Sequence, residues 1–122
     1  MEKIYQSAQS GNLNIVKLAL KRNFNINTPN AQNWTLLHFA CIGGQQEIVQ
    51  FLIEKQANLN ARTSDGVTPL HLAAQVGNEF LISILVEAGA LFDSKDVLIF
   101  LYFQHSINIL TTYVYLESAK GK

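Results

Sequence analysis

The side chains of this sequence that could act as a nucleophile and its base are Cys41 and His38. Because they are three positions apart, a helix would place them on one face, where the imidazole could activate the thiol. Such catalysis also needs a group that orients the base and donors that stabilise an oxyanion, and neither accompanies this pair. Cys41 is the single cysteine, which suits a reducing compartment and rules out a disulfide within the chain. We therefore predict no catalytic residues and a protein that is not an enzyme.

The histidines and glycines offer two further kinds of site. His38, His71 and His105 could coordinate a metal ion, but no Cys-x-x-Cys or His-x-x-x-His spacing accompanies them. His38 and His71 recur at a fixed interval, so each is expected to serve its own segment. Gly43-Gly44 precedes an apolar helix, but the lysine and hydroxyl residue of a phosphate-binding loop are missing. The sequence therefore predicts no metal site and no cofactor.

Composition limits the classes of partner. The chain has 122 residues, of which 48% are hydrophobic, enough for one small domain with a core. Nine basic and nine acidic residues give a net charge of zero, so no basic face and no nucleic-acid partner are expected. The first residues lack the basic and apolar regions of a secretory signal. We therefore expect a cytoplasmic protein, with export by a route that reads no such signal left open.

A repeat explains most of these residues. The stretch Thr35–Cys41 reappears, with conservative changes, as Thr68–Ala74, 33 positions later, and Gly44 recurs at the same interval as Gly77. A constant period of this length is typical of stacked supersecondary units. Such stacks form extended binding surfaces more readily than reaction pockets.

The period divides the chain into three units, and each reads as helix, turn, helix and loop. The first covers residues 2–30, the second 31–63 and the third 64–96. In the third unit Thr68 can cap a helix that starts at Pro69, and His71 lies close enough to exchange hydrogen bonds with that threonine. Gly77 ends this helix, and residues 79–87 form the next one. Regularly spaced glutamates on the second helices indicate a solvated face, namely Glu47, Glu54, Glu79 and Glu87.

The residues Gly66–Gly77, which read GVTPLHLAAQVG, resemble the consensus of the ankyrin repeat family. The second unit is similar to it with three departures, since Asn33 replaces a glycine, Leu36 a proline and Cys41 an alanine. The resemblance implies an all-α solenoid of stacked helix-turn-helix units with loop or β-hairpin tips. It assigns residues 1–96 to one ankyrin-repeat domain.

The repeat pattern stops after Asp96, and residues 97–122 form an atypical apolar segment. From Val97 to Leu116 there is no glycine, proline or charged residue. We predict a helical segment that caps the open end of the stack. A membrane helix is an alternative, because twenty residues would rise about 30 Å, although polar residues such as Asn108 count against it. A degenerate repeat without settled structure is a third.

The resemblance also predicts where a partner binds. In the family, partners contact the loop tips and the exposed side of the first helices, which implies the following residues here: Ala31, Gln32, Trp34, Ile42, Gly43, Ser64, Asp65, Val67, Gln75 and Val76. Trp34 is the strongest candidate, because tryptophan buries much area at an interface for a small loss of entropy. The alternative is that its indole packs against the neighbouring loop near Val67.

The function that follows is non-catalytic protein–protein binding by an adaptor or scaffold. Trp34 and Ile42 would be buried in the partner over an interface of about 1,200 Å² or less. The partner's identity and the oligomeric state are left open. Two alternatives are a membrane-tethered adaptor anchored by residues 97–116 and a regulatory or inhibitory subunit of an enzyme.

Overall fold

The computed structural model describes residues 2–91, which form helices joined by turns and contain no strand. The elements are α1 (Glu2–Ser10), α2 (Leu13–Lys21), α3 (Leu36–Ile42), α4 (Gln46–Glu54), α5 (Pro69–Val76) and α6 (Glu79–Glu87). Residues 79–87 therefore form the predicted helix. Met1 and residues 92–122 lie outside the described part, so the cap, the membrane helix and the degenerate repeat stay predictions.

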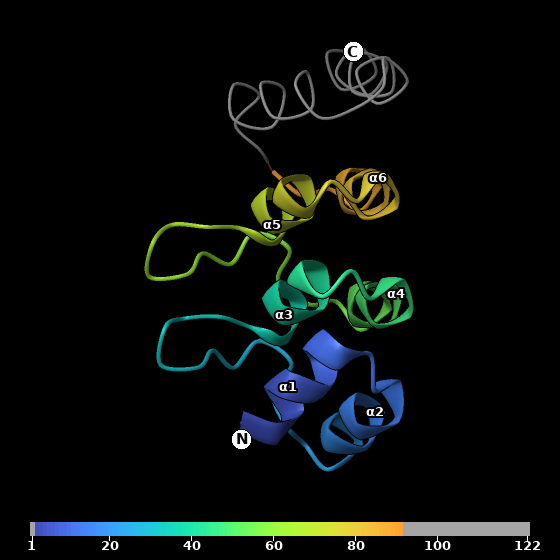
Figure 1. The fold of residues 1–122 in the computed structure, drawn as a ribbon. Helices are drawn as coiled ribbons and strands as arrows, with labels where there is room; N and C mark the ends of the chain where they lie inside the picture. Colours follow the sequence, from blue (N-terminus) through green and yellow to red (C-terminus); the bar gives the residue numbers. More distant parts are fainter. Residues whose placement is uncertain (1, 92–122) are drawn as a thin grey trace.

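The helices form a stack with two columns (Figure 1). The first helices α1, α3 and α5 lie above one another in one column, and α2, α4 and α6 lie in the other. Long loops project from the column of first helices and return to the next unit. The predicted all-α solenoid is confirmed. Its tips are turns, each closed by two backbone hydrogen bonds. In the first tip Asn30 N–H donates to the Trp34 carbonyl and Asn33 N–H to the Asn30 carbonyl, and in the second Thr63 N–H donates to the Val67 carbonyl and Gly66 N–H to the Thr63 carbonyl.

The core lies between the columns and between successive units. Large aliphatic side chains from the second and third units are fully buried there, among them Leu36, Leu52, Leu70 and Leu85. One position is small in every unit: Ala8, Cys41 and Ala74 follow one another at the repeat interval and are all buried. Small side chains let successive first helices approach closely. The thiol of Cys41 therefore stands where the fold requires a small residue.

Local hydrogen bonds start and end the helices as their sequences predict. Thr35 accepts the N–H of His38 and Thr68 that of His71, and each histidine side chain in turn accepts the backbone N–H of its threonine. Asn23 and Gln56, at the positions equivalent to Gly89, adopt positive φ angles of 70° and 64°. The side chains therefore cap the helices, and two non-glycine residues accept the left-handed conformation.

Asparagines near the ends of the units join each unit to the next. The Asn27 side-chain carbonyl accepts the N–H of Asn58 at 2.8 Å, and the Asn60 side chain accepts that of Leu91 at 2.7 Å. Asn25 holds the turn before the first of these links by accepting the N–H of Asn27. These asparagine side chains therefore satisfy backbone groups of the loops and fix the spacing between units.

Candidate functional site

Cys41 and His38 do not form a reactive pair. Cys41 is fully buried, and burial raises the pKa of its thiol far above the ordinary value. The Nδ1 atom of His38 accepts the N–H of Thr35 at 3.0 Å, so the ring proton lies on Nε2, which donates to the Val67 carbonyl at 2.9 Å. Because backbone groups occupy both ring nitrogens, His38 is not available as a base for the thiol.

His38 does more than the repeat suggested. As expected, His38 serves its own unit through its hydrogen bonds with Thr35, but its bond to the Val67 carbonyl also crosses to the next unit. The ring is fully buried and Val67 is half-buried, so this bond is partly shielded from water. Among residues 2–91 no three His, Cys, Asp or Glu side chains gather as a metal site would need. His105 lies outside the described residues.

Burial of His38 makes stability depend on pH. Desolvation lowers the pKa of His38, and the carbonyls of Val67 and Ala61 oppose this only in part. Below about pH 6.5 the unfolded chain therefore binds a proton that the folded protein does not, so the unfolding free energy decreases as the pH falls. Urea titrations at about pH 7.5 and pH 5 measure this effect. Between these two pH values the unfolding free energy of a His38→Phe variant should decrease less than that of the native chain. An equal decrease in both would contradict this.

The two loop tips form one rigid surface, which we call the tip surface and define as Ala31, Gln32, Ser64 and Asp65. The Gln32 carbonyl accepts the N–H of Ser64 at 2.9 Å, which connects the second and third units. Inside the first tip the Asn30 side chain accepts two backbone N–H groups, and Thr63 Oγ1 does the same in the second. Because the backbone is held by these bonds, the four exposed side chains need little ordering on binding.

Trp34 lies at the base of the first tip and is half-buried. Its ring centroid is 5.0 Å from that of Phe39 and 5.8 Å from that of His38, so the indole packs on its own helix α3. Phe39 in turn lies 5.4 Å from the ring of Tyr5 on α1. The indole therefore belongs to an aromatic cluster between the first two units, with part of its surface open to a partner.

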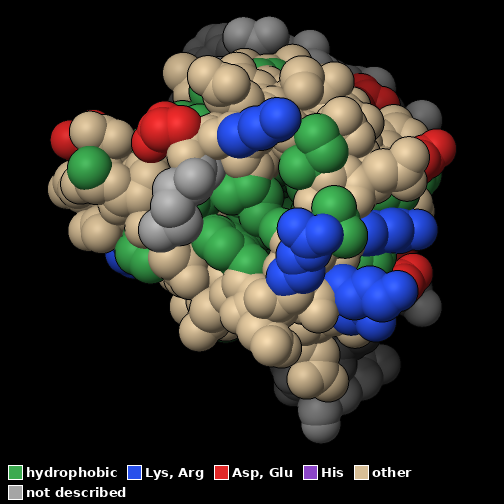
Figure 2. Space-filling model, turned by 90° about the horizontal axis from the view of Figure 1, so that it is seen from below, with side chains coloured by type: hydrophobic (Ala, Val, Ile, Leu, Met, Phe, Trp, Pro, Cys, Tyr) green, Lys and Arg blue, Asp and Glu red, His purple; other side chains and the backbone are tan. Residues whose placement is uncertain are grey.

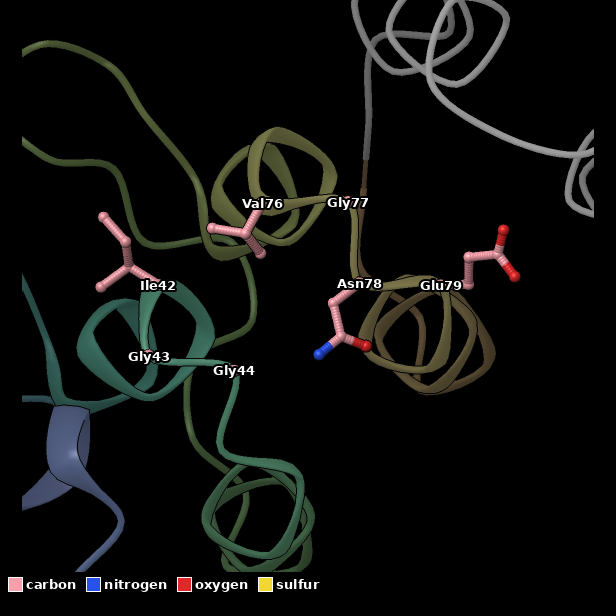
Figure 3. A pocket seen from close by; sticks show the side chains of 7 residues that line it. All are labelled: Ile42, Gly43, Gly44, Val76, Gly77, Asn78 and Glu79. Carbon is pink, nitrogen blue, oxygen red and sulfur yellow. The ribbon is translucent and has the colours of Figure 1, made fainter.

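A hollow of about 450 Å³ lies at the other end of the first helices. We define it by its lining, Ile42, Gly43, Gly44, Val76, Gly77, Asn78 and Glu79. Ile42 and Val76 project to the same side from the ends of α3 and α5, whereas Glu79 points away from them (Figure 3). Val76 is 46% exposed, which makes it the main apolar contact that the hollow offers.

Asn78 gives the hollow a polar group that the sequence reasoning missed. Its Oδ1 atom accepts the N–H of Leu81 at 3.1 Å and caps α6. The amide nitrogen is directed toward Gly44, where it can donate to a ligand carbonyl. The sequence could have indicated this role of Asn78, because the residue directly follows Gly77 in the turn that joins two helices.

The structure places the ten predicted partner residues in two groups joined by the first helices. Four form the tip surface, with the half-buried Trp34 and Val67 at its base. Ile42, Gly43 and Val76 line the hollow, and Gln75 is exposed beside it. Gly43 differs from the others because it also packs against the first unit, where a Cβ atom would lie 2.1 Å from the Gln9 carbonyl oxygen.

Comparison with known proteins agrees with this architecture. The family model described as "Ankyrin repeats (3 copies)" matches residues 4–96. Notch-regulated ankyrin repeat-containing protein A of Danio rerio is 44% identical over 44 residues, which cover 36% of this chain and 39% of that protein. A chain in the solved structure of the Bd0816 predatory endopeptidase from Bdellovibrio bacteriovorus in complex with immunity protein Bd3460 superposes with a TM-score of 0.72. That match has 31% identity and covers 76% of this chain and 49% of the other.

The stacked helix pairs and the surface along their first helices define a helical repeat protein. The chain belongs to the ankyrin repeat family, whose repeats are generally non-catalytic modules for protein–protein interaction. It spans less than half the length of the two relatives named above. Within residues 2–91 no helix has the length and apolar character to cross a membrane, and the segment 97–116 lies outside this range.

Proposed function

We propose that this chain is a non-catalytic adaptor that binds one protein across the tip surface and the hollow together. The observation that carries the proposal is the hollow of about 450 Å³, whose lining includes three of the predicted partner residues, Ile42, Gly43 and Val76. An apolar side chain of the partner would enter beside Val76, and a backbone carbonyl would accept the free N–H of Asn78. Sites of this kind combine apolar walls with a few polar groups that fix orientation.

The two ends of this surface are close enough for one partner. The seven residues of α3 separate the tip from the hollow, and seven helical residues rise about 10 Å. Trp34 lies at the start of this path and Ile42 at its end. The exposed carboxylate of Asp65 and the neutral tip amides favour a partner that is neutral or mildly basic on this face.

A second candidate function is regulation or inhibition of an enzyme. It is supported by the likeness to a chain from the complex of an endopeptidase with an immunity protein. The rigid tip surface and the hollow together could cover the entrance to an active site as well as they could hold a scaffold partner. Inhibition of a captured enzyme by the purified chain would distinguish this function from adaptor binding.

The test is capture of partners from the native cell by the immobilised chain and by three variants. Trp34→Ala should weaken capture of the partner about thirtyfold, as interface tryptophans commonly do, and Val76→Ser several-fold. Leu18→Ser is the matched control, because Leu18 is 47% exposed but lies on α2, in the other column. Equal capture by all four chains would contradict the proposal, as would a loss with Leu18→Ser alone.

A further inference from the structure

The zero net charge of the chain conceals a separation of charge along the stack. The first unit carries four cations and one carboxylate, which are Lys3, Lys17, Lys21, Arg22 and Glu2. The described part of the third unit carries Asp65, Glu79 and Glu87 and no cation. Seen from the N-terminal end, Lys and Arg side chains gather on one side of the molecule beside hydrophobic ones (Figure 2). The expectation that zero net charge leaves no basic face is therefore wrong for this end.

Two of these cations, Lys17 and Lys55, lie over the same aromatic ring. The Nζ atom of Lys17, from α2, lies 5.6 Å from the ring centroid of Phe51 on α4. Lys55, which directly follows α4, places its Nζ atom 5.8 Å from the same centroid. Lys21 and Arg22 follow Lys17 at the end of α2. We define the basic face as Lys17 and Lys55, whose ammonium groups lie over Phe51, together with Lys21 and Arg22 at the end of α2.

Local helix energetics explain only part of this arrangement. Lys21, Arg22 and Lys55 stand at the carboxyl ends of α2 and α4, where cations are favoured by the partial negative charge of free carbonyls. Lys17 lies one turn earlier on the face of Lys21, and like charges four positions apart repel. In residues 2–91 none of these four cations has a carboxylate within salt-bridge distance. The fold thus brings positive charges together and pairs none of them with a carboxylate in this range.

We propose that the basic face binds an acidic, amphipathic segment of a partner protein. Carboxylates of the segment would pair with Lys17, Lys21 and Lys55, and one of its apolar side chains would cover Phe51. The face lies on the second helices α2 and α4, away from the tip surface. The inference is therefore independent of the function proposed above, and the chain would join two proteins on separate faces.

The surroundings of the basic face favour a short acidic segment over a nucleic acid. Glu54 is exposed directly beside Lys55, and Glu47 is exposed on the same helix. A phosphate backbone that continued along the outer helices would meet these carboxylates and be repelled. A protein segment can place its carboxylates opposite the four cations alone and end before Glu47. The half-buried Phe51 adds an apolar contact that such a segment can use.

The experiment measures binding of a fluorescent synthetic helix of about 16 residues, with Glu and Leu at amphipathic spacing, to the full chain. The double reversal Lys17→Glu/Lys55→Glu should weaken binding at least about tenfold. The control Lys3→Glu/Arg62→Glu makes the same change of charge at exposed positions outside the basic face and should stay within about threefold. Raising salt from about 50 to 300 mM should also weaken binding by the native chain several-fold.

Circular dichroism verifies that each variant keeps its helices, and the salt dependence of the native chain is decisive even if a variant unfolds. Equal loss in both double variants, or binding that salt does not change, would overturn the proposal. A single-stranded RNA oligomer or a phosphatidylserine vesicle that binds this face when the acidic helix does not would also overturn it, and would assign the face to that class of ligand.

Discussion

Replacing Gly43 with alanine should decrease the unfolding free energy by about 3 kcal/mol, whereas the same change at the neighbouring Gly44 should decrease it by about 1 kcal/mol. Gly43 has an ordinary φ of −81°, so its backbone accepts an L residue without strain. A Cβ atom there, however, would lie 2.1 Å from the Gln9 carbonyl oxygen and 2.9 Å from the Gln9 carbonyl carbon. Because these atoms are backbone, the first unit must move away from α3.

That movement would also break a second link between the units. The same Gln9 carbonyl accepts a hydrogen bond of 2.9 Å from the side chain of Gln45. At Gly44 the situation is reversed, since φ is +69° and the nearest atom, the amide nitrogen of Asn78, is 3.7 Å from the added Cβ. Alanine at Gly44 therefore meets torsional strain without a clash, and Asn23 and Gln56 accept similar φ angles elsewhere in the chain.

Urea unfolding of the two single variants, followed by circular dichroism, compares the two effects directly. Serine at Gly43 should resemble alanine there, because the clash is made by the Cβ atom alone. Similar unfolding free energies for the variants at Gly43 and Gly44 would show that the first and second units can move apart at little cost. That result would contradict the close packing of Gly43 on Gln9.

Gly43 also illustrates what the sequence could not supply. The family resemblance predicted contact with a partner at this glycine. The approach of the Gln9 backbone was not predictable, because it depends on the spacing between units, which arises from the packing of residues such as Ala8 and Cys41. Helix caps were easier to predict, because Thr35 and Thr68 act on groups within one turn.

The outer surface was harder to predict for a related reason. The aromatic contact of Trp34 with Phe39, and that of Phe39 with Tyr5, combine residues from two units. The basic face likewise joins Lys17 and Lys55, which are far apart in the sequence, on a single ring. The net charge of the whole chain does not reveal such a cluster, because acidic residues elsewhere balance it. The repeat therefore predicts the scaffold well, and the contacts between units determine the surfaces that bind.

A His38→Phe variant, which keeps an aromatic ring but removes both ring nitrogens, should lose about 3 kcal/mol of unfolding free energy. The substitution removes the acceptor for the buried Thr35 N–H and the donor to the Val67 carbonyl. Each group left without a partner away from water costs about 1–3 kcal/mol. Since one bond caps α3 and the other crosses to the third unit, the loss should weaken both the helix start and the contact between units.

Tyr5→Phe is the matched control, because it removes one hydrogen bond, from the Tyr5 hydroxyl to the Thr28 carbonyl at 2.9 Å, and leaves a phenyl ring in place. It should decrease the unfolding free energy by about 1 kcal/mol, since Thr28 is half-buried and water can replace the lost donor to its carbonyl. Urea titrations at pH 7.5, where the imidazole is neutral in both states, separate this effect from protonation of His38. A loss in His38→Phe no larger than that in Tyr5→Phe would mean that the bond to Val67 contributes nothing to holding the second and third units together.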